Sequence, residues 1–388
     1  MNRRCPICAL KKKGFIYRQK FNNKSIAVMA GYDVVICQNC GMLFADRIPV
    51  QADFDKYYAS MSKYEFNYKD GVVAVEYVDH FGKIVDFIEP YLGNKKIKIL
   101  DIGCATGALL SVFKLRRYLD LWGIDPSPSC VKAVRKLYGI KASIDSIASL
   151  KTNKKFDLII LSAVLEHLVD FDSSMRKIRS LLNKGGLLFV GVPDAERFDK
   201  FISAPFQQFS VEHINYFSRL SLQNLLGSFG FEVVKTKKGK SGLNQTVDPD
   251  LFMLVKLTEK AGFKIVKDRV GGVGLRKYIK KCQTIDLKLK QLIRQKLKGV
   301  DKVIVWGVGT HTQRLIGKGW LDVSKVLFFV DSNKRYVGKK LNGIKIKSPE
   351  EIKETNPILI STYSYQKEIE NQIRLVLNLE NEVIKIYS

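Results

Sequence analysis

Short apolar segments alternate with helical patterns in two stretches of this chain, and that alternation limits its fold more than any other feature. The apolar segments are residues 97–100, 121–124, 156–161 and 187–192 in the first stretch and 303–306, 326–330, 358–360 and 383–386 in the second. Strands that are apolar throughout and separated by helices are typical of parallel sheets covered on both faces. The sequence therefore predicts an α/β protein with a Rossmann-like core and a second, smaller Rossmann-like domain.

The chain is long enough for several domains, because it has 388 residues of which 46% are hydrophobic. No apolar run reaches the length of a membrane-spanning helix and no apolar segment follows the basic residues at the start, so we expect a cytoplasmic protein. The predicted parts are a metal-binding ribbon (1–50), an aromatic and helical lead-in and lid (51–93), a cofactor-binding domain (94–240), a basic connector with a helix at 275–298 (241–298) and the C-terminal Rossmann-like domain (299–388).

The net charge of +27 is densest in residues 1–50 and 241–298. A basic surface attracts phosphate groups, whether of nucleic acid, of a nucleotide-sugar or of an anionic lipid headgroup. A lysine-rich composition, with the charges simply solvated at the surface, explains the same net charge. The charge alone therefore does not choose a partner.

Two Cys-x-x-Cys pairs mark the start of the chain, one at Cys5 and Cys8 and the other at Cys37 and Cys40. Four thiolates on two tight turns are the ligand set of a structural zinc ion, with no position left open for a substrate. Disulfides fit less well, because no other feature of the sequence points to an oxidising compartment. We predict a structural zinc ribbon.

A glycine-containing turn follows the first strand of the core, in the sequence DIGCATG that includes Asp101, Gly103 and Gly107. Glycines there allow a tight turn and a close approach of the backbone to a ligand, and the next strand ends at Asp125, which is placed to accept ribose hydroxyls. The dinucleotide pattern G-x-G-x-x-G is incomplete, because no third glycine opens the helix. The turn therefore predicts a nucleoside-containing cofactor other than NAD.

Four stretches, DIGCATG, GIDPS, FDLIILSAVLEHL and LLNKGGLLFVGVPD, resemble in order and spacing the motifs of class I S-adenosylmethionine-dependent methyltransferases. The resemblance implies that Asp101 lies near the methionine amino group of the cofactor and that Asp125 holds its ribose. It places Asp145 and Ser146 near the adenine and Ser162 at the end of the fourth strand. Glu166 and His167 either line that end or pack behind the cofactor.

Glu212 and His213 are candidate catalytic residues, because a carboxylate beside an imidazole suits a general base. Neighbouring residues on a strand point to opposite faces, so both reach one substrate only from a turn or loop. The alternative is a Glu-His turn that packs under the core.

The stretch EHINYFS resembles that of three-domain sugar C-methyltransferases, as do the ribbon at the start, the aromatic segment of Tyr58 and Tyr64 and the Rossmann-like end. That family acts on keto-sugars carried by nucleoside diphosphates, with the His, a Glu and a Tyr promoting deprotonation. The resemblance implies a nucleotide-linked sugar or related glycan precursor as acceptor, with His213, Glu212 and Tyr64 as catalytic candidates. Ser210 stands where the family carries a Tyr, and a glycine-rich stretch is absent near residues 240–245, so C- and O-methylation both stay open.

Two other functions compete with this one. The basic ribbon is similar to ribbons that some RNA methyltransferases join to the same core, although the sequence has no NPPY-like motif for base amino groups. A scaffold that keeps the cofactor fold without chemistry is the second alternative, and Ser210 is its only support. In the last domain the turn of Gly307 and Gly309 lacks a third glycine at Thr312, which favours a substrate-holding or scaffolding role over a second cofactor.

Overall fold

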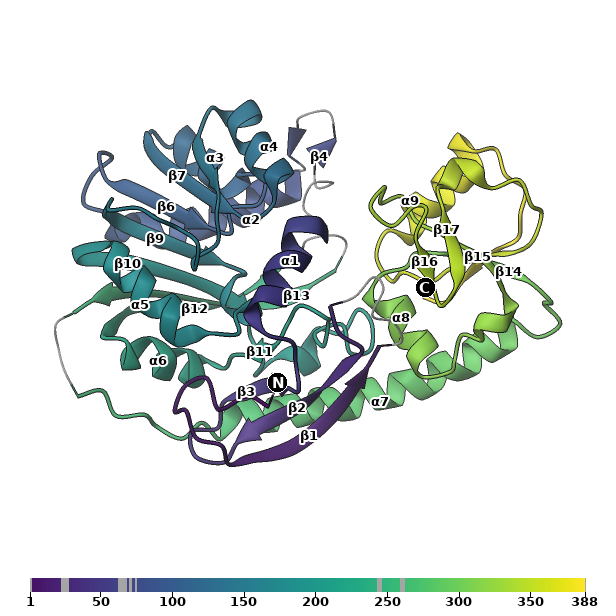
Figure 1. Ribbon diagram of the computed structural model, residues 1–388, viewed down its shortest axis with the longest axis horizontal. Coiled ribbons are helices and arrows are strands. Elements are labelled where there is room, and N and C mark those ends of the chain that lie inside the picture. Colours follow the sequence, from purple (N-terminus) through teal and green to yellow (C-terminus); the bar gives the residue numbers. More distant parts are fainter. Residues whose placement is uncertain are drawn as a thin grey trace.

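The computed structural model describes residues 2–21, 28–61, 68–69, 72–73, 75–242, 246–258 and 262–387. The chain forms a small N-terminal sheet, a large central α/β domain and a C-terminal α/β domain, and one long helix runs from behind the N-terminal sheet to the C-terminal domain (Figure 1). Within the described residues, no helix is long and apolar enough to cross a bilayer.

Within the described residues, the central sheet has seven strands in the order β12-β13-β10-β9-β6-β7-β8. Five of them pair in parallel, and β13 runs antiparallel to both β10 and β12. The strands are β6 (Lys98–Ile102), β7 (Asp120–Asp125), β8 (Lys141–Ile144), β9 (Phe156–Ser162), β10 (Leu182–Pro193), β12 (Phe231–Ser241) and β13 (Asp248–Leu257). The predicted Rossmann-like core is confirmed.

Helices cover both faces of this sheet, as the apolar strands require. The helices α2 (Val75–Ile88), α3 (Ala108–Leu115) and α4 (Pro128–Tyr138) bury their apolar sides on one face, and α5 (Phe171–Leu181) and α6 (Arg219–Ser228) on the other. From β6 the chain adds β7 and β8 on one side and then returns to add β9 on the other. Ligands of such sheets bind at the carboxyl ends of the strands where the order reverses, which here are the ends of β6 and β9.

The N-terminal sheet is antiparallel and includes a strand from far along the chain. Its order is β1 (Lys13–Lys20), β2 (Gly31–Cys37), β3 (Leu43–Asp46) and β11 (Asn215–Tyr216). Asn215 pairs with Phe44 and Tyr216 with Leu43. The segment that carries Glu212 and His213 is thereby fixed to the N-terminal sheet.

Two buried side chains, Arg3 and Asn215, tie this junction together. The Asn215 amide donates to the carbonyl oxygens of Leu165, at 3.1 Å, and Leu168, at 2.7 Å, and its Oδ1 accepts from the Arg3 guanidinium at 3.0 Å. Arg3 also donates to the carbonyl oxygens of Ala45 and Ile214. Buried carbonyl groups need such donors, since an unsatisfied one costs about 1–3 kcal/mol.

Between the ribbon and the core lie α1 (Gln51–Met61), a two-stranded ladder of β4 (Tyr68–Lys69) and β5 (Val72–Val73), and then α2. Figure 1 shows α1 standing beside the edge of the central domain that faces the C-terminal domain. Phe54 of α1 is fully buried in the core that the N-terminal sheet shares with residues 195–216. The helix is therefore anchored at its first turn.

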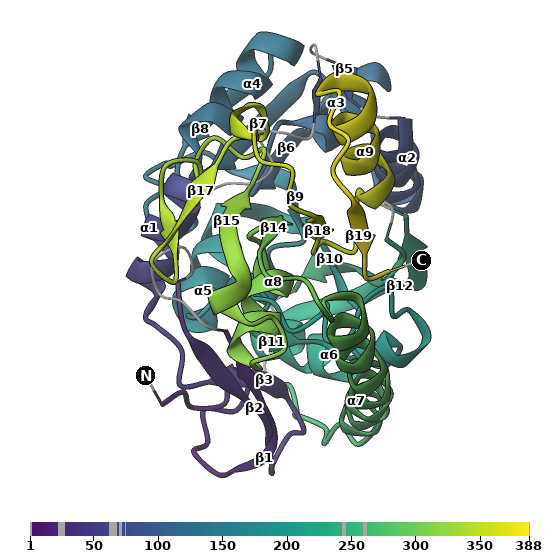
Figure 2. The ribbon, with the colours of Figure 1, turned by 90° about the vertical axis from the view of Figure 1, so that its right-hand side faces the viewer.

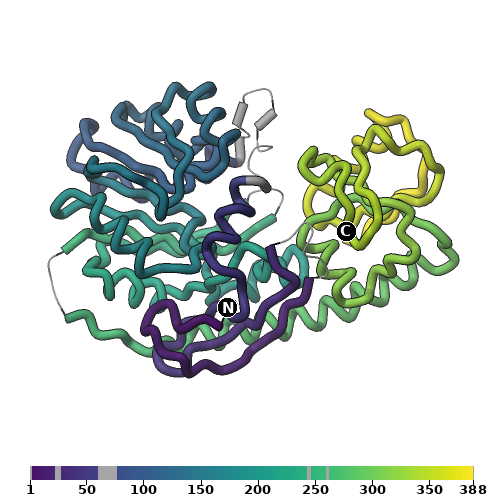
Figure 3. Tube along the Cα trace, in the orientation of Figure 1, coloured from purple at the N-terminus to yellow at the C-terminus, as the bar shows by residue number. Residues whose placement is uncertain are grey.

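The C-terminal domain is a second sheet, ordered β16-β17-β15-β14-β18-β19 and parallel except for the β16–β17 pair. Figure 2 shows this domain in front of the central one, and Figure 3 traces the chain end inside it. Its elements are β14 (Val303–Trp306), α8 (Thr310–Gly317), β15 (Val326–Val330), β16 (Lys340–Leu341), β17 (Ile344–Lys347), β18 (Ile358–Ile360), α9 (Gln366–Asn371) and β19 (Val383–Lys385).

The long helix α7 (Val270–Lys296) links the domains and starts five residues before the predicted 275. The missed first turn contains glycines, which are poor helix formers, but packing requires them there. A Cβ on Gly274 would lie 2.8 Å from the Glu196 carbonyl oxygen. Near the other end, Asp286 accepts from Arg314 of α8 at 2.9 Å in a buried ion pair.

Replacing Asn215 by Ala should lower the unfolding midpoint of the protein clearly, because it removes the side-chain donor of the Leu168 carbonyl oxygen and the acceptor of the buried Arg3 guanidinium, at about 1–3 kcal/mol for each unsatisfied group. Asn94→Ala is the matched control, since the Asn94 amide accepts a single hydrogen bond in an exposed turn. Thermal unfolding followed by circular dichroism measures both. Equal midpoints for the two variants would contradict the role of Asn215.

Candidate functional site

A cavity of about 450 Å³ opens at the carboxyl ends of β6, β7 and β9, where the strand order reverses. Its lining residues come from the turns after those strands and after β8, from the helices α1 and α2, from the start of α5, from the β12–β13 connection and from the bend at residues 212–213. One continuous cavity thus joins the glycine turn to Glu212 and His213, which lie over 100 residues apart in the sequence.

The carboxylates of Asp101 and Asp125 lie at the cofactor end of this cavity. Asp101 is buried at the end of β6, and this burial, with the nearby Asp125, raises its pKa well above the ordinary value. The Asp125 carboxylate accepts from the backbone N–H groups of Ala105 and Ser127, both at 2.9 Å. The turn after β6 is therefore fixed to the end of β7.

The glycine turn requires positive φ at three residues, Gly103 (74°), Ala105 (46°) and Gly107 (86°). Gly103 lines the cavity, whereas Gly107 does not and precedes the first turn of α3. A Cβ on Gly107 would lie 3.0 Å from Val134 of α4. We conclude that Gly107 shapes the turn and that its neighbours face the ligand.

The other predicted cofactor residues, Asp145, Ser146 and Ser162, line the same cavity. Sequence reasoning missed three lining residues of α2, which are Tyr77, His80 and Phe81. Burial lowers the pKa of His80 to about 4, so its imidazole is neutral near pH 7. The only signal for these residues was the amphipathic pattern of the helix, which shows that one face is buried but not that this face lines the cavity.

Glu212 and His213 lie in an irregular bend, so both side chains reach the cavity, as expected for a turn. The Ser210 hydroxyl holds this bend by accepting from the backbone N–H groups of Glu212, at 3.2 Å, and His213, at 3.0 Å. The Ser210 carbonyl oxygen accepts from the Tyr32 hydroxyl at 2.9 Å. Ser210 thus organises the candidate site.

His167 links the bend to α1. Its Nδ1 lies 3.0 Å from the Glu212 carbonyl oxygen and 3.1 Å from the Tyr58 hydroxyl. The Tyr57 hydroxyl donates to Glu212 Oε1 at 3.0 Å, and burial together with the Glu212 charge raises the pKa of Tyr57 well above its ordinary value. Tyr57 therefore stays protonated near neutral pH.

The two tyrosines predicted near the site, Tyr58 and Tyr64, have different outcomes. Tyr64, predicted as a catalytic candidate, lies outside the described residues. Tyr58, the second candidate, lines the cavity, and so do Asp55, one turn earlier on α1, and Gln51, two turns earlier. The sequence pattern did not identify these two, because their role follows from the position of α1 beside the cavity.

The cavity is acidic although the chain is strongly basic. Among the described residues that line it there is no lysine or arginine, and its histidines are His80, His167 and His213. Its carboxylate side chains are Asp55, Asp101, Asp125, Asp145, Asp170, Glu212 and Asp248. Such a lining favours cationic and hydroxyl-bearing ligands and disfavours phosphate groups.

The two Cys-x-x-Cys turns meet, as predicted, and the ligand atoms of Cys5, Cys8, Cys37 and Cys40 all lie within 4.8 Å of one another. The sulfur atoms of Cys5 and Cys40 are 3.4 Å apart, and those of Cys8 and Cys37 are 3.5 Å apart. A tetrahedral zinc ion places thiolates about 3.8 Å apart. All seven cysteines are among the described residues and none of them forms a disulfide, so the four at the start fit a metal ion.

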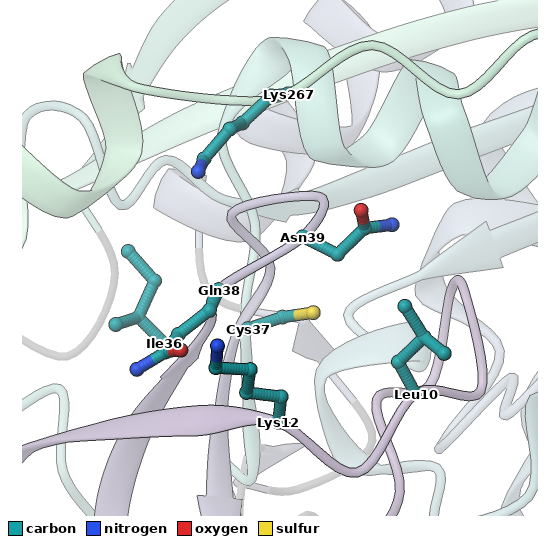
Figure 4. A pocket seen from close by; sticks show the side chains of 7 residues that line it. All are labelled: Leu10, Lys12, Ile36, Cys37, Gln38, Asn39 and Lys267. Atoms are coloured by element: carbon teal, nitrogen blue, oxygen red, sulfur yellow. The ribbon is translucent and has the colours of Figure 1, made fainter.

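A second hollow, of about 560 Å³, lies beside this cysteine cluster (Figure 4). Lys12 and Lys267 contribute amines to it, and Cys37 and Asn39 belong to the second cysteine turn. The segment before α7 forms one wall, because the Asp268 N–H donates to the Cys40 carbonyl oxygen at 2.8 Å. The cysteine cluster is thereby connected to the helix that spans the domains.

Residues 75–236 match the family model described as a methyltransferase domain, and residues 299–384 match the model described as C2185-like, N-terminal. A ubiquinone biosynthesis O-methyltransferase of Pelagibacter ubique is 36% identical over 101 residues, 25% of this chain and 42% of that protein. A tRNA U34 carboxymethyltransferase of Campylobacter fetus is 25% identical over 185 residues, 44% of this chain and 65% of that protein.

Solved structures with a similar fold include magnesium protoporphyrin IX methyltransferase of Synechocystis with bound SAH, at 18% identity and a TM-score of 0.41, covering 54% of this chain and 100% of that one. The chain spans less than half the length of the Pelagibacter protein and about two thirds of the Campylobacter one. The matched family model and the strand order of the central sheet both indicate a methyltransferase domain. Residues 75–236 of this chain are therefore an S-adenosylmethionine-dependent methyltransferase domain.

Proposed function

We propose that the protein transfers a methyl group from S-adenosylmethionine to an acceptor that binds between the glycine turn and the bend of Glu212 and His213. The observation that carries this proposal is the single cavity that both features line. When bound, the cofactor supplies an electrophilic methyl carbon on a sulfonium centre. The residues of the chain hold the cofactor, position the acceptor and remove its proton.

The residues at the cofactor end suit this ligand. Asp101 is a buried carboxylate with a raised pKa, and a cationic amino group beside it would favour the ionised form. Asp125 is held by two backbone N–H groups at the mouth of the turn, where a ribose would lie. Asp145 and Ser146 line the wall beyond it, which we assign to the adenine.

For the acceptor we propose a nucleotide-linked sugar or a related glycan precursor. A neutral sugar ring suits a cavity that offers carboxylates, hydroxyl groups and imidazoles and no lysine or arginine among its described lining residues. The phosphates would then lie outside the cavity, near basic residues of the C-terminal domain. There Arg335 of the C-terminal domain lies 3.4 Å from the Ser129 hydroxyl, in the first turn of α4.

We assign proton removal from the acceptor to His213, with Glu212 beside it. The imidazole lines the cavity, and its backbone is fixed by Ser210 and by the β3–β11 pairing. Tyr57 and Tyr58 lie on the α1 side, where they exclude water from the reacting atoms. Positioning and a general base are sufficient for O- as well as C-methylation.

For the cysteine cluster we propose a structural zinc ion. Four thiolates leave no open position, and the cluster lies against the central domain, away from the cavity. The ion would fix the ribbon, and with it β3 and its partner β11, in place. Its contribution to activity is therefore indirect.

Asp101→Asn should weaken S-adenosylmethionine binding about tenfold to a hundredfold, the value of a hydrogen bond between charged groups. Because burial raises the pKa of Asp101 well above the ordinary value, the affinity of the wild-type protein should also rise with pH as the carboxyl ionises, in a range above that of an ordinary aspartate. Isothermal titration calorimetry measures both effects. Asp120→Asn, at the opposite end of β7, is the matched control, and equal losses in both variants would contradict the assignment.

Cys37→Ser should remove zinc from the purified protein and lower its unfolding midpoint, because three thiolates hold the ion more weakly than four. Metal content by atomic emission gives the stoichiometry, expected near one ion per wild-type chain. Cys282→Ser is the control, since this buried thiol lies outside the cysteine cluster and accepts from the Phe206 N–H at 3.2 Å. A wild-type protein without bound metal would refute the zinc proposal.

His213→Ala should lower turnover by about 10²–10⁴, the contribution of a general base, without changing cofactor affinity. The assay follows label from S-adenosylmethionine into a panel of nucleotide-sugars, with Asn94→Ala as a control at the amino end of the sheet. Undiminished turnover of the His213 variant would contradict the base assignment. Cofactor binding without transfer to any nucleotide-sugar would contradict the acceptor class.

An RNA methyltransferase and an enzyme acting on nucleotide-sugars should differ in how their affinity for RNA depends on salt concentration. If the basic ribbon held RNA, the affinity for an RNA pool would fall steeply as salt rises, because phosphate contacts release counterions. Our proposal predicts weak binding with a shallow slope. Steep binding together with label transfer to RNA would replace the nucleotide-sugar by RNA.

A further inference from the structure

We propose that Glu166, His167 and His213 form a binding site for one divalent cation at the acceptor end of the cavity. One ligand atom from each residue, a carboxylate oxygen or a ring nitrogen, lies within 4.8 Å of the other two. His167 and His213 line the cavity, and Glu166 lies behind them, 1% exposed. The role of the cation rests on the proposed function, whereas its binding does not.

The distances fit a cation after small movements. His167 Nε2 lies 4.0 Å from Glu166 Oε1, too far for a hydrogen bond, and the His167 and His213 rings are 5.1 Å apart at 66°. A cation about 2.0–2.2 Å from each ligand atom separates the ligands by about 3–4 Å. Side-chain rotations that move the ligand atoms by less than about 1 Å would bring them to these distances around the cation.

The hydrogen bonding of His167 orients the ring for such a role. Its Nδ1 lies 3.0 Å from the Glu212 carbonyl oxygen, and because a carbonyl oxygen only accepts, this bond places the ring proton on Nδ1. The lone pair is then on Nε2, on the side of Glu166. Imidazoles that bind metals are commonly oriented by a hydrogen bond from their other nitrogen to a backbone carbonyl.

The backbone holds the three residues together before any ligand binds. Glu166 and His167 lie in the 3-10 turn Leu165–His167 that follows β9. The Glu166 carbonyl oxygen accepts from the Ile214 N–H at 2.9 Å, directly after His213. Asn215 donates to the same turn at Leu165 and Leu168. Two imidazoles and one carboxylate on such a frame suit Mn²⁺, Fe²⁺ or Zn²⁺ and leave positions open.

A cation at this place would change how the acceptor loses its proton. A hydroxyl oxygen of the acceptor would occupy an open position, which would lower its pKa, so that the O–H bond would break and the proton would pass to the Glu212 carboxylate in the same cavity. The oxygen–carbon bond then forms as the carbon–sulfur bond of the cofactor breaks, giving a methyl ether and S-adenosylhomocysteine. His213 would be a ligand rather than the proton acceptor.

The test is Mn²⁺ binding to the full, zinc-loaded chain, followed by electron paramagnetic resonance of the free ion. Mn²⁺ prefers oxygen and nitrogen donors, so the cysteine cluster does not compete. We expect one site per chain, weakened at least about tenfold in His167→Ala, His213→Ala and Glu166→Gln. His80→Ala should leave binding unchanged, because His80 lines the same cavity outside the cluster.

The outcomes separate this proposal from the proposed function. An absent Mn²⁺ site, or one that all three cluster variants keep, overturns the cation site even if methyl transfer is observed. A site lost in the variants supports it even if no nucleotide-sugar is methylated, in which case only the acceptor assignment fails. His213 is partly exposed and Glu166→Gln keeps the side-chain shape, so at least these two variants should fold; thermal unfolding checks this.

Discussion

The hydrogen bonds of the Asn215 side chain join three segments that lie far apart in the sequence. Its amide donates to the turn after β9, its carbonyl group accepts from Arg3, and its backbone pairs with Phe44 of β3. His167 stands on the first of these segments, and His213 lies two residues before Asn215. The separation of the two imidazoles therefore depends on the N-terminal sheet being in place, which gives the cysteine cluster an indirect part in the chemistry.

The charge of the cavity is opposite to that of the chain as a whole. A sulfonium cofactor carries a cationic amino group and a cationic sulfur, and both are stabilised by carboxylates such as Asp101. A phosphate in the same space would be repelled. If the acceptor is a phosphate-bearing sugar, its two halves must lie in different environments, the ring in the cavity and the phosphates near basic residues such as Arg335.

Local patterns predicted four strands of each sheet, because each of these is an apolar run between turns; β14, β15 and β18 begin and end where expected. They missed β8, β12, β13, β16 and β17, and β13 belongs to the central sheet although it lies in the predicted connector 241–298. The sequence also predicted that Asp101, Asp125 and Ser162 lie in one cofactor site, and they do lie at one edge of the sheet because the carboxyl ends of parallel strands meet there. It could not reveal Arg3 and Asn215, which have no local signal because their partners lie up to 212 residues away. The early start of α7 was missed for the same reason, as its glycines serve contacts with distant backbone.

Ser210 shows why a departure from a family pattern needs a structure. The hydroxyl of a serine reaches its own turn and accepts from the N–H groups two and three residues ahead, which stabilises the bend. A tyrosine hydroxyl at that place lies too far from the backbone to do so. Phenol groups reach the site instead from α1, where Tyr57 contacts Glu212 and Tyr58 contacts His167. The structure therefore has Ser210 holding the bend, while phenol groups of α1 contact the Glu212 and His167 side chains.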